Sequence, residues 1–407
     1  MSKNIDEQME FNKLNLLSFF QNQIIHERRN REKKNLQYTN FFKSAFNFLI
    51  DNNYDEAKKS CKSLKKRSLK WLLYLEFEFY CKIFNKKLPT IENISSVFGV
   101  RLKRYDKFMK DVDKKLPKSR FSQQSYNNFL SFENHMEHYK TLPVKNIAVC
   151  ATMSAGKSTF VNALLGRDVL PARSEATTAK ITSVYDNDNS KSLIGFVDVN
   201  GKIVDRCLDT NLSIINRWND DSNVSRIYLQ GNLDGIGNNG IIAALHDTPG
   251  TNYSGDNTHH DITLKFLTSN KFDALIYVAN ATQLCTTDES IMLKEIYKNV
   301  VDKNKTPVIF VLNKADCLDP EKEEVTEIIE RYRNYLEEIG FNNAMVYPLS
   351  SKSARILKMV RNNLSENLTG KEKKELRTIQ ALFPDLDSTG LPEVERYIEK
   401  IIGGKND

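Results

Sequence analysis

Residues 146–160 combine the residue types of a phosphate-binding loop with the spacing that such a loop needs. Gly156, Lys157 and Ser158 fit the end of the pattern G-x-x-x-x-G-K-[ST], and Ala151 stands at the position of its first glycine. In this pattern, backbone N–H groups surround the phosphates, the lysine reaches the β- and γ-phosphates, and the hydroxyl binds Mg²⁺. The sequence therefore predicts a nucleoside triphosphate site here.

Two elements must position this loop. The apolar residues 147–149 predict a buried strand before it, and residues 160–165 predict a helix after it, whose N-terminus would face the phosphates. Ala151 fits a tight turn less well than glycine if φ must be positive there. An ordinary strand-turn-helix remains the alternative reading of this segment.

The metal side of the site is predicted from three further residues. Thr178 follows Ser158 by twenty residues, and a hydroxyl on such a loop can reach Mg²⁺ and sense the γ-phosphate, as in a GTPase switch. Asp247 follows an apolar strand and precedes Gly250, whose N–H can meet the γ-phosphate. The expected metal ligands are Ser158, Thr178 and Asp247.

The base is predicted from the Asn-Lys-Ala-Asp sequence at residues 313–316, which follows the apolar segment 308–312. The carboxylate of Asp316 can accept from guanine N1–H and the exocyclic amine. Adenine lacks these donors, and unpaired buried polar groups cost about 10⁴-fold in discrimination, so GTP is favoured over ATP. A Ser-Ser-Lys turn at 350–352 can brace the base. The residues expected around GTP or GDP are Ala151, Met153, Ser154, Ala155, Gly156, Lys157, Ser158, Thr159, Asp247, Gly250, Asn313, Lys314, Asp316, Ser351 and Lys352.

These motifs lie at the ends of apolar strands that alternate with helical segments, so the sequence predicts a doubly wound α/β P-loop domain with its ligand at the strand C-termini. Residues 183–246 alternate around an Asn-Gly turn at 200–201 and predict strands, some antiparallel, at the sheet edge. Ahead of this domain, apolar residues recur at helical spacing, for example within 14–24 and 123–139. We expect an all-α basic helical bundle or neck at residues 1–140 and a GTPase domain at 141–404.

Charge is unevenly distributed along the 407 residues. Residues 1–144 carry 28 Lys and Arg against 16 Asp and Glu, a balance of +12, whereas the remainder carries −5. This asymmetry favours an anionic partner, either lipid headgroups or nucleic acid, although the lysines could simply solvate helices. No apolar run approaches the ~18 residues of a transmembrane helix, and no secretory signal begins the sequence. Six cysteines without a C-x-x-C pair predict reduced thiols in a cytoplasm.

With these motifs in place, the chain resembles the dynamin superfamily of large GTPases, in particular bacterial dynamin-like proteins, over about residues 140–404. Met-Ser-Ala-Gly-Lys-Ser at 153–158 and Gly-Arg-Asp-Val-Leu-Pro at 166–171 look like the family's phosphate loop and the end of the following helix. Asp-Thr-Pro-Gly-Thr-Asn at 247–252 and Leu-Pro-Glu-Val-Glu-Arg-Tyr-Ile at 391–398 are also similar to family sequences.

The resemblance implies roles for individual residues. Ser154 would help place a charge-compensating K⁺ or Na⁺, Lys157 would bind the phosphates, and Thr178 would bind Mg²⁺ with Ser158 and hold the attacking water. With Gly250, the expected catalytic set is Ser154, Lys157, Thr178 and Gly250. The resemblance also implies GTPase domains that dimerise across the nucleotide, and membrane remodelling as the usual output.

The sequence departs from the family in three places. Met153 stands where eukaryotic dynamins carry a glutamine that orients water, and Ala151 replaces the first glycine of the loop. The family's long stalk is missing from the roughly fifty residues after the last nucleotide motif. We expect either the N-terminal helices or a second dynamin-like partner chain to supply it.

Together these features predict a Mg²⁺-dependent GTPase that is cytoplasmic and peripheral to the inner face of the cell membrane. Two alternatives stay open: an RNA- or ribosome-associated regulatory GTPase, and a protein-binding module timed by GTP. The absence of a KH-type G-x-x-G loop disfavours RNA without excluding it.

Overall fold

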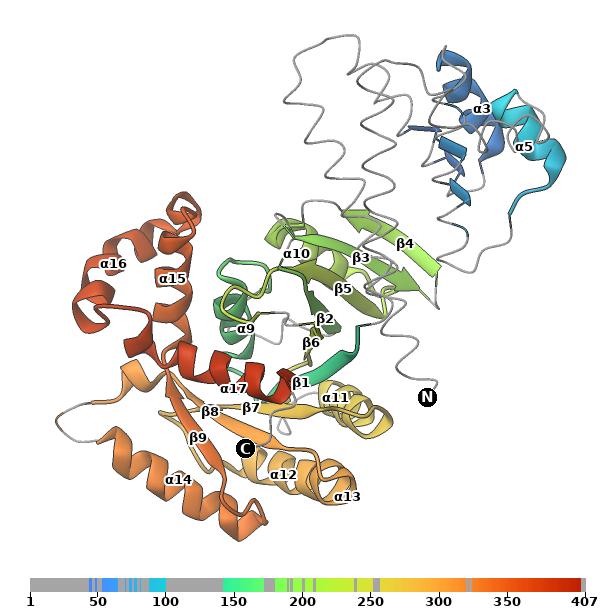
Figure 1. Cartoon of the computed structure of the whole chain (residues 1–407). Helices are drawn as coiled ribbons and strands as arrows, with labels where there is room; N and C mark the ends of the chain where they lie inside the picture. Colours follow the sequence, from blue (N-terminus) through green and yellow to red (C-terminus); the bar gives the residue numbers. More distant parts are fainter. Residues whose placement is uncertain are drawn as a thin grey trace. The chain divides into compact units, whose positions relative to one another are not determined.

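The computed structural model divides the chain into two compact units, Met1–Thr141 and Leu142–Asp407 (Figure 1). The helices predicted within residues 14–24 and 123–139 lie outside the residues that the structure describes. The described residues of the first unit are 44–45, 48–49, 53–64, 70, 73–74, 77–78, 81 and 88–99. Those of the second unit are 142–403 except 172–179, 189, 191–192, 200–201, 208–209, 238–239, 252–256, 320 and 322–323.

Two helices of the first unit are described in full, α3 (Tyr54–Ser63) and α5 (Ile91–Phe98). The Asn53 side chain caps α3 by accepting from the N–H of Glu56, and Gly99 ends α5 in the left-handed conformation that glycine adopts without steric cost. Phe98 meets the ring of Tyr74 edge-on, with ring centroids 5.3 Å apart. These described parts are therefore helical, with an aromatic core of their own.

The second unit is built on one sheet whose nine described strands lie in the order β4-β3-β5-β2-β6-β1-β7-β8-β9 (Figure 1). Strands β6, β1, β7, β8 and β9 are parallel neighbours, whereas β2 pairs antiparallel with β6 and the β3–β4 hairpin forms one edge. The strands are β1 (Val144–Ala151), β2 (Ile181–Asp186), β3 (Ile194–Val199), β4 (Lys202–Cys207), β5 (Arg226–Gly231), β6 (Ile242–Asp247), β7 (Ala274–Asn280), β8 (Val308–Asn313) and β9 (Met345–Leu349). This arrangement confirms the predicted doubly wound, mostly parallel P-loop fold.

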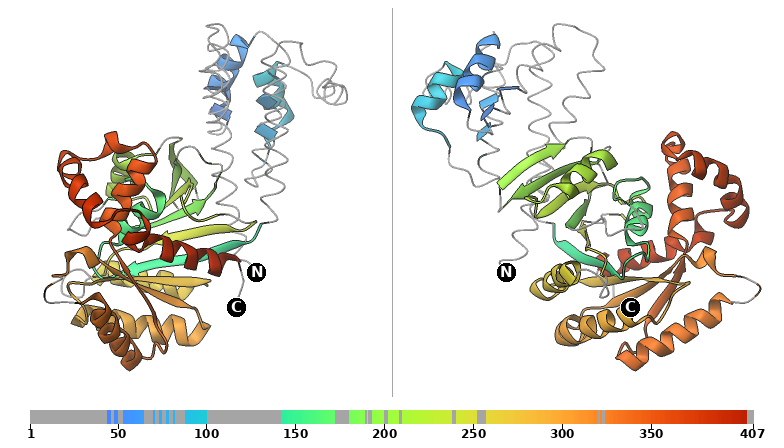
Figure 2. Two further views of the ribbon diagram at one scale, coloured as in Figure 1. Left: turned by 60° about the vertical axis from the view of Figure 1, so that its left-hand side comes forward. Right: turned by 180° about the vertical axis from the view of Figure 1, so that it is seen from behind.

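Helices cover both faces of the sheet because successive side chains of each strand point to opposite faces. Along β1, Ile147 and Val149 pack on the side of α9 and α17, while Ala148 and Cys150 pack on the side of α11, α12 and α14. Figure 2 shows these two helical layers on opposite sides of the sheet. The helices are α9 (Lys157–Leu165), α10 (Leu212–Asp220), α11 (Asn257–Ser269), α12 (Thr287–Ile296), α13 (Asp302–Asn304), α14 (Val325–Ile339), α15 (Ser351–Arg361), α16 (Gly370–Leu382) and α17 (Leu391–Gly403). Strands buried on both faces read as continuous apolar runs, which made them recognisable from sequence.

A buried lysine joins three of these helices. Lys358 of α15 is fully buried, and its ammonium donates to the carboxylate of Glu395 on α17, to the carbonyl of Leu164 in α9 and to the carbonyl of Asp234 after β5. Burial lowers the pKa of Lys358 and raises that of Glu395, while their mutual attraction opposes both shifts. Three acceptors around one ammonium supply the pairing that a buried charge requires.

None of the described helices is both long enough and apolar enough to cross a bilayer.

Candidate functional site

The phosphate-binding loop, residues 151–158, connects β1 directly to α9, which begins at Lys157. Two of its residues adopt left-handed backbone, Ser154 with φ of 63° and Gly156 with φ of 89°. Ala151 is still part of β1 and is not among the described residues with positive φ. The alanine at the first glycine position therefore carries no left-handed strain, because the turn is made later in the loop.

Gly156 is required by a close contact as well as by its backbone. A Cβ built there would lie 2.2 Å from Nδ2 of Asn313, at the end of β8. That Nδ2 donates to the carbonyl of Ala155 at 2.8 Å, and Oδ1 of the same amide accepts from the backbone N–H of Ser351 at 3.1 Å. Asn313 is buried. The base-side motif thus holds the phosphate-binding loop against the start of α15.

Lys157 and Asp247 form a buried ion pair between the start of α9 and the end of β6. Asp247 is fully buried and its Oδ2 has no hydrogen-bond partner among the described residues. Burial raises the pKa of Asp247, and the neighbouring ammonium of Lys157 only partly offsets this. A buried orphaned carboxylate oxygen beside a phosphate-binding loop fits Mg²⁺, which binds through one or two carboxylates and otherwise through hydroxyls, waters and phosphate oxygens.

Mg²⁺ sites of this kind need few protein carboxylates. Among the described residues no group of three or more His, Cys, Asp or Glu side chains could hold a metal on its own. The predicted partner hydroxyl of Ser158 stands on the first turn of α9. Thr178, the other predicted ligand, lies outside the described residues.

Gly250 lies close to the phosphate-binding loop. A Cβ there would be 3.5 Å from the Cα of Met153, and the N–H of Met153 donates to the carbonyl of Thr251 at 2.9 Å. Thr251 also donates its backbone N–H to the carbonyl of Ala151 at 3.2 Å. The structure therefore brings the segment after Asp247 alongside the loop.

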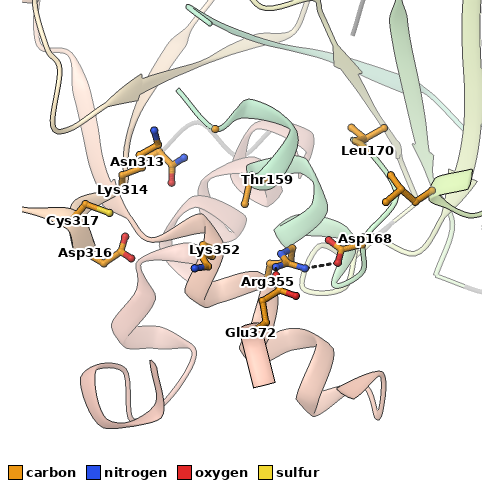
Figure 3. A pocket seen from close by; sticks show the side chains of 12 residues that line it. Thr159, Asp168, Leu170, Asn313, Lys314, Asp316, Cys317, Lys352, Arg355 and Glu372 are labelled. Carbon is orange, nitrogen blue, oxygen red and sulfur yellow. Dashed lines mark hydrogen bonds and ion pairs between the residues drawn. The ribbon is translucent and has the colours of Figure 1, made fainter. Parts of the chain in front are cut away.

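The base-side residues line one cavity of about 580 Å³, shown in Figure 3. Asp316 lies in the short 3-10 turn Ala315–Cys317, just after Lys314, which has a left-handed φ of 64°. Lys352, on the first turn of α15, forms an ion pair with Glu375 of α16 at 2.6 Å. The cavity is lined by Gly156, Thr159, Asp168, Leu170, Leu212, Asn313, Lys314, Asp316, Cys317, Lys352, Arg355 and Glu372.

Half of this lining was not predicted from the sequence. Asp168 and Leu170 follow α9, Leu212 begins α10, and Arg355 and Glu372 come from α15 and α16. Arg355 could have been suggested by its position one helical turn after Lys352. Leu212 and Glu372 carry no motif, and only the fold brings them to the cavity.

Comparison with known proteins matches residues 147–315 to the model of the Dynamin family. This segment holds the phosphate-binding loop, the Asp247 region and the first three residues of the Asn-Lys-Ala-Asp motif. This match confirms the resemblance to the dynamin family that was drawn from the motifs.

Within that class, one curated relative is an uncharacterized protein from the xynA 3′ region of Caldicellulosiruptor sp. (strain Rt8B.4). It is 29% identical over 212 residues, which cover 51% of this chain and 49% of the relative. The chain thus spans about half the length of this relative.

Solved structures that are similar to this chain include an oligomerised bacterial dynamin pair described as sensing and tethering membranes. It is 18% identical, with a TM-score of 0.41 over 83% of this chain and 58% of that chain. Another is a dimerization-deficient mutant of Toc33 from Arabidopsis thaliana, 12% identical, with a TM-score of 0.35 over 68% of this chain and 91% of that chain.

Proposed function

We propose that this chain hydrolyses GTP to GDP and phosphate in a Mg²⁺-dependent reaction. The observation that carries the proposal is that three motifs meet at the carboxyl ends of the parallel strands β1, β6 and β8. Asn313 contacts the phosphate-binding loop, Asp247 pairs with Lys157 of that loop, and Asp316 lines the cavity that begins at Gly156. This is the arrangement that a P-loop GTPase uses to hold base, phosphates and metal together.

Each protein group has a task in this reaction. Lys157 would leave Asp247 for the β- and γ-phosphate oxygens, while the backbone N–H groups of residues 154–159 would surround the phosphates at the N-terminus of α9. Ser158, Thr178 and Asp247 would hold Mg²⁺, which neutralises charge on the β- and γ-phosphates when bound. The N–H of Gly250 would donate a hydrogen bond to the γ-phosphate, and Thr178 would hold the attacking water.

Phosphoryl transfer needs a positive charge beside the oxygen that bridges the β- and γ-phosphates. This charge would come from K⁺ or Na⁺ held near Ser154. The thioether side chain of Met153 cannot donate a hydrogen bond to water or to the developing charge. Ser154 has the left-handed backbone at the tip of the loop and is exposed. The predicted switch is the loop that carries Thr178. This loop would close around the ion when two chains dimerise across the nucleotide.

Asp316→Asn tests the base assignment. This variant should bind GTP more weakly and xanthosine triphosphate more tightly, because xanthine offers an acceptor where guanine has a donor. The measurement is competitive binding of GTP, xanthosine triphosphate and ATP. Unchanged GTP affinity in the variant would overturn the assignment of guanine to this cavity.

We further propose that the GTPase works at an anionic membrane surface on the cytoplasmic side, alone or with a second dynamin-like chain. Its support is the balance of +12 in residues 1–144. Each well-placed Lys or Arg adds about 1 kcal/mol of attraction to anionic lipid, and the attraction fades with salt. The chain should co-sediment with vesicles containing phosphatidylserine more than with phosphatidylcholine vesicles, and less at high salt. Tighter binding to RNA than to any vesicle would favour the nucleic-acid alternative instead.

A further inference from the structure

Two buried oxygen atoms without hydrogen-bond partners among the described residues belong to neighbouring strands, β2 and β6 (Figure 1). One is Oδ2 of Asp247, which the proposed function assigns to Mg²⁺. The other is Oγ1 of Thr182, a fully buried residue to which neither the motifs nor the proposed function gives a role. Thr182 and Asp247 stand directly opposite each other in the antiparallel register of the two strands.

The side chains of Thr182 and Asp247 project from the same face of the sheet, because directly opposite residues of an antiparallel pair share a face. Their Cβ atoms are expected about 4.5–5.5 Å apart. This face is the one that α9 covers, since Lys157 at the start of α9 pairs with Asp247. On the same face, Val184 and Leu245, which also stand opposite each other, belong to the core cluster that includes α9. Thr182 therefore lies beside the proposed metal site.

Two other buried threonines show how such a hydroxyl is usually satisfied. Thr248 donates Oγ1 to the carbonyl of Val149 at 2.9 Å, and Thr263 donates Oγ1 to the carbonyl of Pro249 at 3.0 Å. A buried hydroxyl without a partner costs free energy, and valine would fill nearly the same space without this cost. A polar ligand held by the neighbouring carboxylate would supply the partner that the hydroxyl of Thr182 needs.

The start of β2 is fixed by a second buried group. Lys180, two residues before Thr182, is buried, and its ammonium donates to the carbonyl of Trp218 at 2.9 Å and to that of Asp221. These carbonyls belong to the last turn and the C-cap of α10, where the helix dipole favours a cation. The strand that carries Thr182 is thus held in place before a ligand arrives, which lowers the cost of ordering it on binding.

We propose that Thr182 is a positioning residue of the Mg²⁺ site, with its hydroxyl hydrogen-bonded to the hydrated ion that Asp247 holds. This inference rests on the proposed Mg²⁺-dependent function. Mg²⁺ gives up water reluctantly and usually keeps several water molecules when it binds protein carboxylates. A threonine hydroxyl can accept a hydrogen bond from such a water molecule and donate one to a carboxylate. Groups that orient the ligands of a metal typically contribute about 10- to 100-fold to its affinity.

The test compares Thr182→Val, which removes the hydroxyl and nearly keeps the shape, with Thr182→Ser, which keeps the hydroxyl. Binding of fluorescent methylanthraniloyl-GDP to the full chain is measured in EDTA and over a series of buffered Mg²⁺ concentrations. Thr182→Val should need at least about tenfold more Mg²⁺ than wild type for the half-maximal effect on binding. In EDTA it should bind the nucleotide as tightly as wild type, and Thr182→Ser should stay close to wild type throughout.

Unfolding by urea in EDTA, without nucleotide, separates this role from a purely structural one. Thr182→Val should unfold at the same urea concentration as wild type or at a higher one, because it removes a buried hydroxyl that has no partner. Thr210→Val is the matched control. Thr210 is also buried, but its Oγ1 donates to the carbonyl of Cys207, at the end of the edge strand β4. This control should unfold at a lower urea concentration and keep the wild-type Mg²⁺ dependence.

Three results would overturn the role of Thr182 and leave the guanine site standing. They are wild-type Mg²⁺ dependence in Thr182→Val, an equal loss in Thr182→Val and Thr182→Ser, and nucleotide binding by wild type that does not respond to Mg²⁺. Loss of folding in Thr182→Val would also contradict the proposal, because it would show that the hydroxyl stabilises the fold itself. If wild type binds no guanine nucleotide in either buffer, the proposed function is wrong and this inference fails with it.

Discussion

The amide of Asn313 bridges two segments far apart in sequence, with Nδ2 2.8 Å from the carbonyl oxygen of Ala155 and Oδ1 3.1 Å from the backbone nitrogen of Ser351. It joins the phosphate side of the cavity to the base side without touching the predicted base-reading carboxylate. The shape of the site should therefore depend on Asn313 even before nucleotide binds.

Asn313→Ala should lower the free energy of unfolding by about 1–3 kcal/mol, because it leaves a buried carbonyl and a buried N–H unpaired. It should also weaken GDP binding. The measurement is chemical unfolding with and without GDP. Asn270→Ala is a suitable control, since Asn270 donates a comparable 2.8 Å bond to the carbonyl of Phe266, outside the cavity. Equal effects of the two substitutions on GDP affinity would contradict the bridging role.

Lys157→Ala and Thr178→Ala should separate binding from turnover. Lys157→Ala removes the charge expected on the phosphates and leaves Asp247 buried without its partner, so tight nucleotide binding should be lost. Thr178→Ala should keep GTP affinity and reduce turnover, because its contact matters when the switch closes. Equilibrium binding and single-turnover hydrolysis measure the two effects. Normal hydrolysis by Thr178→Ala would mean that the switch residue lies elsewhere.

Specific GTPase activity should rise with protein concentration and be higher in KCl or NaCl than in choline chloride of equal ionic strength. Ser154→Ala should lose this preference for the small cation. An arginine in that place typically contributes about 10³- to 10⁵-fold in rate, so the effect should be large. Arg173 lies five residues before Thr178 in the sequence and could supply the charge instead. If activity depends on neither concentration nor cation while Arg173→Ala abolishes it, an arginine and not a monovalent ion supplies the charge. Arg173 lies outside the described residues.

Asp186, at the end of β2, should make the domain less stable as pH rises. It is fully buried, its Oδ1 accepts from the N–H of Leu233 at 2.8 Å, and its Oδ2 has no partner among the described residues. Burial raises its pKa from 3.8 to about 8. The folded state thus binds the proton more tightly than the unfolded state, so this contribution to stability is complete below about pH 4 and is lost between there and pH 8.

Asp186→Asn should therefore gain stability relative to wild type as pH rises, by up to about 1.4 kcal/mol per pH unit within this window. Urea unfolding at pH 5, 6.5 and 8 measures the difference. The exposed Asp261 on α11 offers a control, because Asp261→Asn removes a carboxylate from solvent and not from the core. A constant difference between Asp186→Asn and wild type at all three pH values would contradict this account.

The sequence was most informative where a motif coincides with a strand end. The apolar runs at 274–279 and 308–312 could be recognised as buried strands from their own residues. The motif that follows the second run also indicated which end of that strand faces the site. Ala151 was harder to interpret, because the residue that takes the left-handed turn is decided by the path of the whole loop. The structure gives that turn to Ser154 and Gly156.

Other features depend on contacts that local sequence does not encode. The antiparallel pairing of β2 with β6 lies inside the sheet, where sequence predicted antiparallel strands only toward the edge. Asp168 and Glu372 reach the cavity because both pair with Arg355, and a single acidic residue in a sequence does not reveal its partner. Only the packing of α15 between α9 and α16 brings them together.

The single ammonium of Lys358 has a mechanical consequence. It is bonded at once to α17, to the end of α9 and to the segment after β5, and it stands on α15, whose first turn lines the cavity. Pulling α17 away would leave a carboxylate and an ammonium buried without each other, at a cost of several kcal/mol. A force that pulls on α17 is therefore transmitted through Lys358 to α15 and α9, the two helices that begin beside the cavity.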